Sequence, residues 1–344
     1  MIHSASLPSP VLVLVDGNNL SYSVAHYDPS DPSKRHSTLL SMLRALSRVL
    51  STNGLTSPGR VVMTWDSGLA PWRVKLFPQY KAKRAEARAQ ESAEDALRRD
   101  QRYIDIKALR YSVLPWLGVD QLSGGCTEGD DLILYAIDHL ARAGQYKSVL
   151  IMSGDRDLDQ LLTPQSVANA LGAPGIYRVT PAGLWARGGM ECLTGHDALA
   201  KYRVWPEDYV GVKAIIGDAS DNIPGVGGCA DGTMRPLMDK CGNKLENFFA
   251  QGKDGPLIPT RAKVCFTPEG LETIGRNVAI MTLRWPEEAV LFTPGARCAT
   301  YAKSNEMVGL AEAALRAPSL NIPSGDVDGI NFGNFLELIQ QKGD

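Results

Sequence analysis

The pattern of hydrophobic positions in the first part of the chain predicts alternating strands and helices. Three short apolar runs, at residues 11–15, 60–65 and 148–152, are each followed by turn-forming residues, as buried strands are. Between the first two runs, residues 39–50 place leucine and valine at helical spacing. Strands that alternate with helices favour an α/β fold with a mostly parallel sheet.

Each of the three predicted strands ends at an aspartate. Asp16 opens the sequence Asp-Gly-Asn-Asn, Asp66 opens Asp-Ser-Gly, and Asp155 follows Ser-Gly. In an open parallel sheet, ligands bind in the crevice outside the carboxyl ends of the strands. We therefore expect these three carboxylates to lie together on one rim of the sheet.

The pattern changes beyond residue 205. Pro206 is placed in the first turn of a helix, and helical spacing then continues, with a glycine-rich interruption, to about residue 285 without a convincing strand pattern. The last part is rich in proline and glycine and ends in a short predicted helix at residues 332–341. We predict three parts: an α/β core at residues 1–205, a mainly helical module at 206–290, and an extension at 291–344.

Composition narrows the class of protein. The 344 residues are 44% hydrophobic and 22% charged, which excludes wholesale disorder and a collagen-like repeat. No apolar run approaches the ~20 residues that span a bilayer, and the N-terminus lacks the pattern of a signal peptide. The six cysteines form no C-x-x-C pair, so we expect reduced thiols and a cytoplasmic location, which is the host cytoplasm if the protein is viral.

The net charge of −2 hides a basic segment. Residues 73–110 carry eleven lysines and arginines against six acids, and from residue 82 onward they are rich in helix-forming alanine, arginine and glutamate. The composition alone fits a solvated amphipathic helix and a nucleic-acid-binding helix equally well.

Further carboxylates accompany the three at the strand ends. Taken singly, each fits turn or helix-capping chemistry. Taken together, clustered carboxylates repel one another unless protons or cations bridge them, and hard divalent cations prefer oxygen ligands. The absence of a histidine near these motifs argues against a zinc hydrolase. The candidate metal ligands are Asp16, Asp66, Glu128, Asp130, Asp131, Asp155, Asp157, Asp218 and Asp221.

A glycine-rich stretch at residues 220–228 is the second candidate site. Exposed backbone N–H groups there could approach a DNA phosphate without reading a base. A tight connection between two helices is the alternative interpretation.

In this order and spacing, the motifs resemble those of the 5′-nuclease superfamily of flap endonucleases and 5′–3′ exonucleases. The resemblance is greatest to the phage enzymes and to the 5′-nuclease domain of bacterial DNA polymerase I, and it runs from about residue 11 to residue 290. It is carried by Asp16, Asp66, Trp72-Arg73, the run Pro78-Gln79-Tyr80-Lys81-Ala82-Lys83-Arg84, Glu128-Gly129-Asp130-Asp131, Ser153-Gly154-Asp155-Arg156-Asp157 and the run from Gly217 to Val226.

The resemblance implies a fold and a chemistry. The fold would be a PIN-like core with a helical arch at about residues 73–115 and a helix–three-turn–helix module for duplex DNA. The first metal cluster would be Asp16, Asp66, Glu128, Asp130 and Asp131, and Asp155, Asp157, Asp218 and Asp221 would form or support the second. Two or more Mg²⁺ ions, replaceable by Mn²⁺, would be the cofactors.

The resemblance also implies how DNA is handled. Lys81 and Arg84 would face the scissile phosphate as catalytic residues, and Tyr80 would stack on a base. The partner would be branched or 5′-ended DNA, bound by a monomer that is a free-standing nuclease, and a phage replication enzyme is the source we expect. The implied DNA-binding residues are Arg73, Tyr80, Lys83, Lys213, Gly225, Gly227 and Gly228.

The chain departs from the family in the duplex-binding loop. The family usually continues after the glycines with an aliphatic residue, a glycine and then a lysine two positions on, whereas this chain has Cys229, Ala230 and Gly232 at those positions. A phosphate-contacting lysine is missing, for which Arg235 or Lys240 would have to compensate. A monovalent ion at residues 225–230 is therefore in doubt.

Three alternatives remain at the level of the sequence. A Toprim-type phosphoryl transferase also has Asp-x-Asp after a strand, but its glutamate belongs at a strand end, whereas Glu128 opens a predicted helix. A PIN-type ribonuclease shares the core but lacks the arch and the glycine-rich module. A non-catalytic branched-DNA-binding protein would lack metal ligands, and none of the nine is missing.

Overall fold

The computed structural model describes most of the chain from residue 7 to residue 292. The described residues are 2–3, 7–24, 30–31, 37–51, 58–141, 146–185, 190–292, 311–316, 324–328 and 330. Most of the predicted extension, including the helix expected at residues 332–341, lies outside these ranges. Within them, no helix is long and apolar enough to cross a lipid bilayer.

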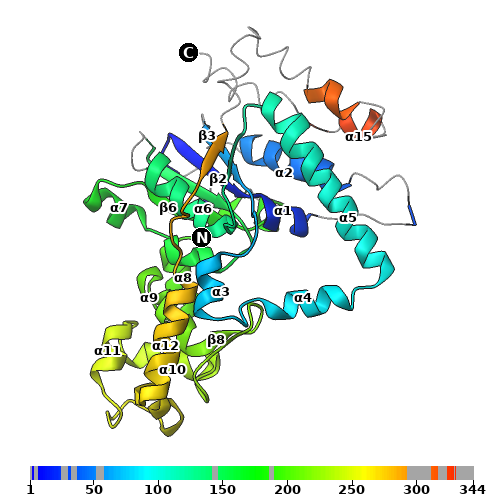
Figure 1. Ribbon diagram of the computed structural model, residues 1–344. Helices are drawn as coiled ribbons and strands as arrows, with labels where there is room; N and C mark the ends of the chain where they lie inside the picture. The colour runs from blue at the N-terminus through cyan, green and yellow to red at the C-terminus, as the bar shows by residue number, and fades with distance from the viewer. Residues whose placement is uncertain are drawn as a thin grey trace.

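A six-stranded sheet forms the centre of the α/β part (Figure 1). All neighbouring strands are parallel except β10, which pairs antiparallel with β4 at one edge. In spatial order the strands are β10 (Val290–Phe292), β4 (Asp120–Ser123), β3 (Pro58–Thr64), β2 (Val11–Asp16), β5 (Ser148–Met152) and β6 (Gly175–Val179).

The three predicted strands are the three central ones, and β2 shows why its sequence is continuously apolar. Val11, Val13 and Val15 belong to an apolar cluster that includes α2 (Ser37–Ser51). Leu12 and Leu14 point the other way, into a cluster with α6 (Gly129–Ala136). A strand that is buried on both faces needs apolar residues at every position, as parallel strands covered by helices do.

Helices α4 (Ala82–Ala89) and α5 (Ala93–Ala108) form a span that stands away from the core, as Figure 1 shows. They follow α3 (Pro71–Leu76), and α4 buries none of its residues. The second half of α5 returns to the core, where the buried Asp105 accepts a hydrogen bond from the Leu39 N–H at the start of α2 (3.2 Å). Both ends of this span are thus anchored, as in an arch: the Lys81 N–H at its start donates to the Asp221 carbonyl, and Asp105 near its end contacts α2.

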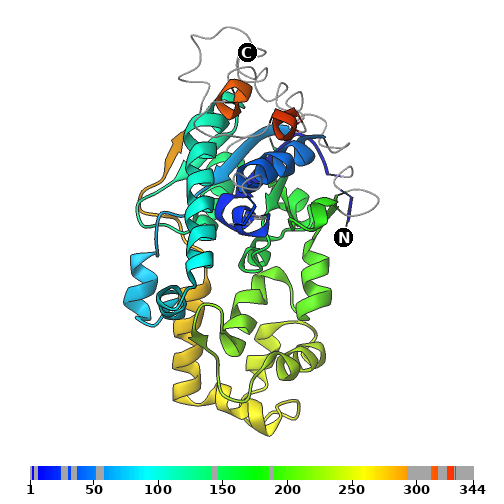
Figure 2. The same cartoon turned by 90° about the vertical axis from the view of Figure 1, so that its right-hand side faces the viewer.

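Residues 206–281 are mainly helical and lie below the sheet (Figure 2). They have their own apolar core, to which Val212, Met234 and Phe248 contribute. A short antiparallel hairpin, which the sequence did not predict, joins the first two helices of the module. The elements are α9 (Pro206–Ile216), β8 (Gly217–Asp218), β9 (Ile223–Pro224), α10 (Asp231–Lys240), α11 (Leu245–Ala250), the 3₁₀ segment Thr260–Phe266 and α12 (Pro268–Met281).

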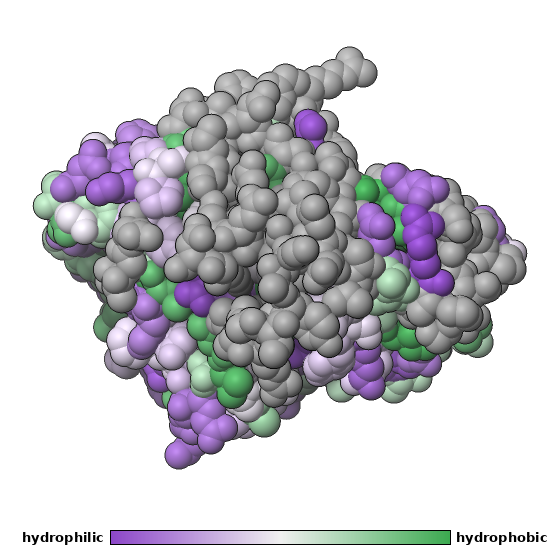
Figure 3. All heavy atoms as spheres, turned by 90° about the horizontal axis from the view of Figure 1, so that it is seen from above, coloured by the Kyte–Doolittle hydropathy of each residue, from purple (hydrophilic) through white to green (hydrophobic). Residues whose placement is uncertain are grey.

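Smaller elements complete the described part of the chain. In the view from above, hydrophilic and hydrophobic side chains are interspersed over the described surface (Figure 3). The remaining helices and strands are α1 (Gly17–Ser23), the π-helical segments Leu109–Val113 and Ile137–Ala141, the 3₁₀ segments Leu114–Trp116, Asp157–Leu161 and Gly183–Trp185, α7 (Gln165–Leu171), α8 (Gly195–Tyr202), α15 (Ser324–Asp328), and β1 (Ile2–His3), which pairs with β7 (Glu191–Cys192).

Candidate active site

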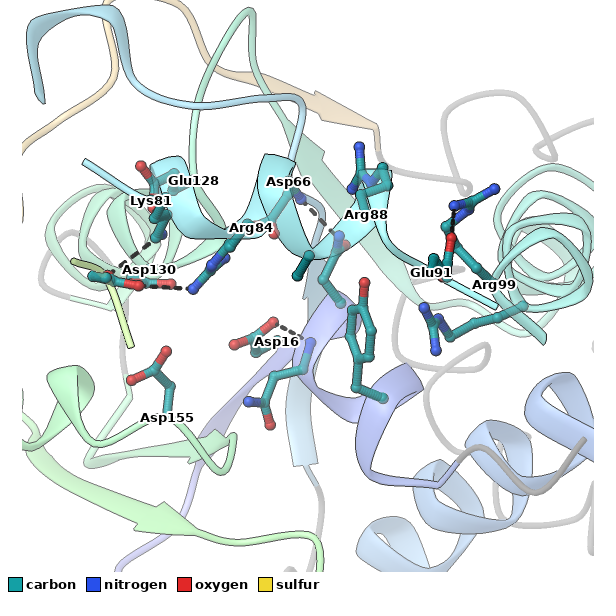
Figure 4. Close-up of a pocket in the computed structure, with 16 residues that line it drawn as sticks. Asp16, Asp66, Lys81, Arg84, Arg88, Glu91, Arg99, Glu128, Asp130 and Asp155 are labelled. Carbon is teal, nitrogen blue, oxygen red and sulfur yellow. Dashed lines mark hydrogen bonds and ion pairs between the residues drawn. The ribbon is translucent and has the colours of Figure 1, made fainter. Parts of the chain in front are cut away.

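A cleft of about 550 Å³ lies at the carboxyl ends of β2, β3 and β5, under the arch. In Figure 4, Asp16 and Asp155 lie on one side of this cleft, and Lys81 and Arg84 enter it from the other. The cleft therefore joins the strand-end carboxylates to the basic segment. Its lining residues are Asp16, Asn18, Asn19, Tyr22, Asp66, Lys81, Arg84, Ala87, Arg88, Glu91, Arg99, Arg102, Glu128, Asp130, Asp155 and Asp221.

Asp16 both caps a helix and faces the cleft. One carboxylate oxygen accepts a hydrogen bond from the Asn19 N–H (2.9 Å), which caps α1, and the other accepts from the Ser153 hydroxyl (2.9 Å). Ser153 Oγ in turn accepts from the Asp155 N–H (3.0 Å), so it links the ends of β2 and β5. Asp16 therefore caps a helix, as expected of an aspartate in a turn, and it also belongs to the carboxylate cluster of the cleft.

The Asp66 carboxylate fixes the first turn of α6 through a hydrogen bond to its backbone. Its Oδ1 accepts from the Gly129 N–H (2.6 Å). A side chain at position 129 would place its Cβ 2.8 Å from that oxygen, so a glycine is required for this close approach. The contact brings the first turn of α6, and with it Asp130, to the end of β3.

The cluster is electrostatically strained in the absence of a cation. Burial, reinforced by the neighbouring Asp66, raises the pKa of Asp16 to about 7. Burial also raises the pKa of Asp66, and it raises that of Asp130 together with the charges of Asp155 and Asp16. Buried carboxylates of like charge favour either a shared proton or a bound cation. Their all-oxygen donor set fits a hard divalent ion.

The metal-free protein should lose stability as the pH rises from about 4 to about 7. A carboxyl group whose pKa is raised on folding binds a proton more tightly in the folded state. Its contribution to the free energy of unfolding is therefore full below about pH 4 and is lost as the pH rises past the folded-state pKa of about 7. Asp16→Asn keeps the acceptor for Asn19 but removes the titration. In chelator, urea unfolding should show the variant more stable than wild type at pH 8 by roughly 1–4 kcal/mol, at 1.36 kcal/mol per pKa unit.

The control for this measurement is Glu86→Gln, which removes a carboxylate from the exposed surface of α4. Its stability relative to wild type should change little between pH 5 and pH 8. An Asp16→Asn effect of equal size at both pH values would contradict the raised pKa.

Glu128 lies between the arch and the core. Its Oε2 accepts from the Tyr80 hydroxyl (3.0 Å) and pairs with the Lys81 ammonium, and its Oε1 lies 3.3 Å from Arg73 Nη1. Burial alone would raise its pKa, but Lys81 and Arg73 outweigh burial, so the pKa of Glu128 is lowered. Glu128 is therefore held ionised. The Tyr80 ring is buried, so the base-stacking surface expected of it is not exposed.

Asp131 and Arg73 have a different role from the expected ones. They form a buried bidentate ion pair (2.6 and 2.9 Å), and Arg73 Nε donates to the Ile280 carbonyl (3.0 Å). Arg73 is only 3% exposed, so its guanidinium braces α3 against α6 and α12 and is not presented to DNA. The helix α6 begins after Glu128, which turns Asp130 toward the cleft and Asp131 away from it.

A second acidic group lies beside the first. Asp157, Asp218 and Asp221 each place one oxygen within 4.8 Å of the others, which is a spacing that could hold a metal ion. The Lys213 ammonium pairs with Asp157 and lies 2.7 Å from Asp218, so it stands within this group and not on an open DNA surface.

The two partners of Lys213 differ in charge state. Burial raises the pKa of Asp157 to about 6, with Asp155 adding to it. For Asp218, burial is outweighed by Lys213, which lowers the pKa to about 2. The Lys213 ammonium therefore already neutralises part of the negative charge of this group.

Lys81 and Arg84 come from the start of the arch. Lys81 has a left-handed backbone (φ 55°), its N–H donates to the Asp221 carbonyl (2.9 Å), and its ammonium lies 3.7 Å from the Asp221 carboxylate. Arg84 Nη2 lies 2.8 Å from Asp221 Oδ1 while its side chain stays 59% exposed. Glu128 and Asp221 overcome the effect of burial and raise the pKa of Lys81, which keeps it charged.

Several lining residues were not singled out from the sequence. Asn19 Oδ1 accepts from the Gly154 N–H (2.7 Å) and Asn18 Oδ1 from the Asp66 N–H (3.3 Å), so both asparagines tie strand ends together. Their position directly after Asp16 at a strand end was the available signal. Arg88, Arg99 and Arg102 were counted only as part of a basic segment, because composition does not show which face of a helix points inward.

The glycine-rich loop contains one closely packed glycine and one with open space around its backbone. A Cβ at Gly225 would clash with the Ile216 carbonyl oxygen, so Gly225 is needed for the hairpin. Gly227 has open space around it, and Gly228 has a left-handed backbone (φ 81°). Cys229 is buried, with its Sγ 3.3 Å from that of Cys265, so it takes the packing position of an aliphatic residue.

Near this loop, a second hollow of about 590 Å³ is lined by Lys83, Asn222 and Gly225. Arg235, which was one candidate to replace the missing lysine, is paired with Asp231 (2.7 Å).

Residues 11–183 match the family model of the 5′–3′ exonuclease, N-terminal resolvase-like domain. DNA polymerase I of Mycobacterium tuberculosis is 28% identical over 256 residues, which cover 70% of this chain and 25% of the polymerase. The chain thus spans about a quarter of the length of such relatives. A 5′–3′ exonuclease of Buchnera aphidicola is 26% identical over 241 residues, 69% of this chain and 72% of that protein.

Solved structures show the same fold. The bacteriophage T5 flap endonuclease, in a complex with DNA and metal ions, aligns with a TM-score of 0.60 at 20% identity over 97% of this chain and all of that one. The catalytic core of Rad2 in complex with DNA substrate aligns with a TM-score of 0.52 at 15% identity, over 97% and 95% of the two chains. The expected α/β fold is confirmed, and the chain belongs to the family of 5′–3′ exonuclease N-terminal, resolvase-like domains.

Proposed function

We propose that this chain is a metal-dependent 5′ nuclease that hydrolyses phosphodiester bonds at 5′ flaps or 5′ ends of DNA. The observation that carries the proposal is the meeting of Asp16, Asp66, Asp130 and Asp155 with Lys81 and Arg84 in one cleft under an arch. Acidic residues alone would repel a phosphate, and basic residues alone would only bind one. The family of the chain and the structures it resembles support the same reaction.

The carboxylates of the cleft would hold the cation. Burial and neighbouring carboxylates raise the pKa values of Asp16 and Asp130, and burial raises that of Asp66, so these three residues fit this role, and Asp155 lines the same cleft. Glu128, in contrast, is already balanced by Lys81 and Arg73. Asp157, Asp218 and Asp221 would hold or support a second ion, for which Mg²⁺ or Mn²⁺ is the natural choice. Bound divalent ions activate water and polarise a phosphate.

The chain's own basic groups would orient the substrate. Lys81 and Arg84 place two positive charges where the phosphate enters, and they are held there by Glu128 and Asp221. Fixed charges of this kind stabilise the negative charge that develops on the phosphate oxygens. The backbone of Gly227 and Gly228, together with Lys83, would contact the duplex. Arg73, Tyr80 and Lys213 are left out of this surface because they are buried or paired.

A fluorescent 5′-flap DNA tests the proposal. Incubation with Mg²⁺ or Mn²⁺ should release a short labelled product, and a chelator should abolish it. Nicked, blunt and single-stranded DNA would map the preferred end, and a single-stranded RNA of the same sequence would test the ribonuclease alternative. Tight binding of the flap with no cleavage in any metal would instead indicate a non-catalytic DNA-binding protein.

A further inference from the structure

A buried ion pair lies directly behind the segment that carries Asp155 and Asp157. Arg178, on β6, is 1% exposed, and Asp159, in the 3₁₀ segment Asp157–Leu161, is 2% exposed. Arg178 Nε donates to Asp159 Oδ1 (2.7 Å), and Arg178 Nη2 lies 2.6 Å from the same oxygen. Neither residue is among those that line the cleft, so the pair can act on the site only through other groups.

Arg178 also holds the end of β5. Its Nη1 donates to the Ser153 carbonyl (2.9 Å), while the Ser153 N–H donates to the Val179 carbonyl (3.1 Å). The Ser153 hydroxyl is the group that donates to Asp16 and accepts from the Asp155 N–H. One buried guanidinium therefore fixes the backbone of the residue that links the carboxylates at the ends of β2 and β5.

The same guanidinium fixes the other end of this segment. Asp159 lies in the turn that begins at Asp157, and the Asp157 N–H donates to Asp155 Oδ1 (2.9 Å). Arg178 thus bridges the two residues, Ser153 and Asp159, that bracket both carboxylates. Because Asp155 lines the cleft and Asp157 belongs to the second acidic group, the bridge lies across the connection between the two groups.

A third contact ties the ion pair to the helical module. The second oxygen of Asp159 accepts from the Tyr202 hydroxyl (2.7 Å) at the end of α8. The Tyr202 ring packs against Tyr209 of α9 (4.5 Å between ring centres), and α9 also carries the Lys213 that pairs with Asp157. All nitrogen and oxygen atoms of the two paired side chains thus have a polar partner, and fully satisfied buried networks of this kind are rigid.

We propose that the Arg178–Asp159 pair positions the segment between them and the end of β5, and so holds the two acidic groups at the separation that two bound metal ions require. Apolar residues of similar size would fill the same buried space, since replacing a buried ion pair by such residues is often neutral or stabilising. The chain instead has a guanidinium whose planar fork reaches the Asp159 carboxylate and the Ser153 carbonyl at once. The inference rests on the metal sites of the proposed function.

The test replaces the pair without leaving a buried charge. Arg178→Met/Asp159→Leu removes both charges and the hydrogen bond to Ser153 and keeps apolar side chains of similar size. Equilibrium binding of Mn²⁺ to the full chain without DNA is measured by electron paramagnetic resonance of the free ion, next to urea unfolding in chelator. We expect the Mn²⁺ affinity to fall about tenfold or more, the range observed when groups that orient metal ligands are removed, while the urea midpoint stays close to that of wild type.

The matched control is Arg60→Met/Asp120→Leu. It removes another arginine–aspartate ion pair, which lies near the amino ends of β3 and β4 and thus at the opposite edge of the sheet from the cleft. This control should leave the Mn²⁺ affinity unchanged. A second test variant, Arg178→Lys, keeps the buried positive charge but lacks the fork that reaches both acceptors, so it should fold and still weaken Mn²⁺ binding.

Each other outcome counts against a stated part of the argument. Wild-type Mn²⁺ affinity in the double variant overturns the proposal and leaves the pair a purely structural role, and an equal loss of affinity in the control also overturns it. If the double variant does not fold, Arg178→Lys decides, since wild-type affinity in that variant overturns the proposal. A wild-type chain that binds Mn²⁺ but cleaves no 5′ flap in Mg²⁺ refutes the proposed nuclease function, while the Mn²⁺ titration still decides this inference. A wild-type chain that binds no Mn²⁺ refutes both.

Discussion

Asp130→Asn is expected to lower the rate of flap cleavage by about 10³-fold or more while the protein stays folded. Asp130 is half-buried in the cleft beside Asp155 and Asp16, and its pKa is raised well above the usual value by desolvation and by those two charges. Asparagine keeps the shape of the side chain but removes the charge that a cation requires. The metal-free variant should therefore unfold at the same or a higher urea concentration than wild type.

The neighbouring Asp131→Asn is the matched contrast. Both oxygens of Asp131 accept hydrogen bonds from the buried Arg73, so loss of its charge leaves a guanidinium poorly compensated. Breaking a buried ion pair on one side costs about 3 kcal/mol or more. We expect Asp131→Asn to lose stability, and to retain cleavage at a temperature where it is still folded.

Single-turnover cleavage at saturating Mg²⁺ and urea unfolding in chelator, measured on both variants, separate the two roles. If Asp130→Asn cleaves at the wild-type rate, the metal assignment is wrong. If Asp131→Asn is stable but inactive, Asp131 is a ligand after all, as the family resemblance implied.

The strand ends could be predicted from sequence because two independent signals coincide there. An apolar run flanked by turn residues identifies a buried strand, and parallel strands bring their carboxyl ends to one edge. Asp16, Asp66 and Asp155 followed from this alone. Strand β4 (Asp120–Ser123) escaped prediction because three of its four residues are polar, although two of these, Asp120 and Gln121, are buried in the folded structure.

The direction of individual side chains could not be predicted in the same way. Glu128, Asp130 and Asp131 were all expected to hold a metal ion, but Glu128 precedes the first turn of α6, and of the two aspartates only Asp130 lines the cleft. Arg73 and Lys213 looked like DNA ligands because cations near a nuclease site usually are. In the structure Arg73 neutralises the buried Asp131 and Lys213 neutralises the half-buried Asp218, which only the packing of α3 and α9 against the core determines.

Lys81→Ala is expected to lower the single-turnover rate by ~10²-fold or more, the range observed on losing one preorganised electrostatic group. The Lys81 side chain is 9% exposed, and its ammonium is held by Glu128 and Asp221 at the cleft, so it needs no reorganisation when charge develops on the phosphate. The dissociation constant should change far less, because the duplex is bound through the glycine-rich loop and surface bases. An interaction that is stronger in the transition state than in the ground state acts on the rate and not on affinity.

Lys83→Ala is the matched control, because Lys83 is two residues further along the arch, exposed, and directed to the hollow beside Gly225. It should weaken binding modestly and leave the chemical step intact. Both constants are measured for both variants on one flap substrate, with urea unfolding to check that Lys81→Ala remains folded. A Lys81→Ala variant that binds poorly but cleaves bound DNA at the normal rate would make Lys81 a docking residue. A silent variant would mean that the ammonium serves only to neutralise Glu128, and that the phosphate is stabilised by the cations and Arg84.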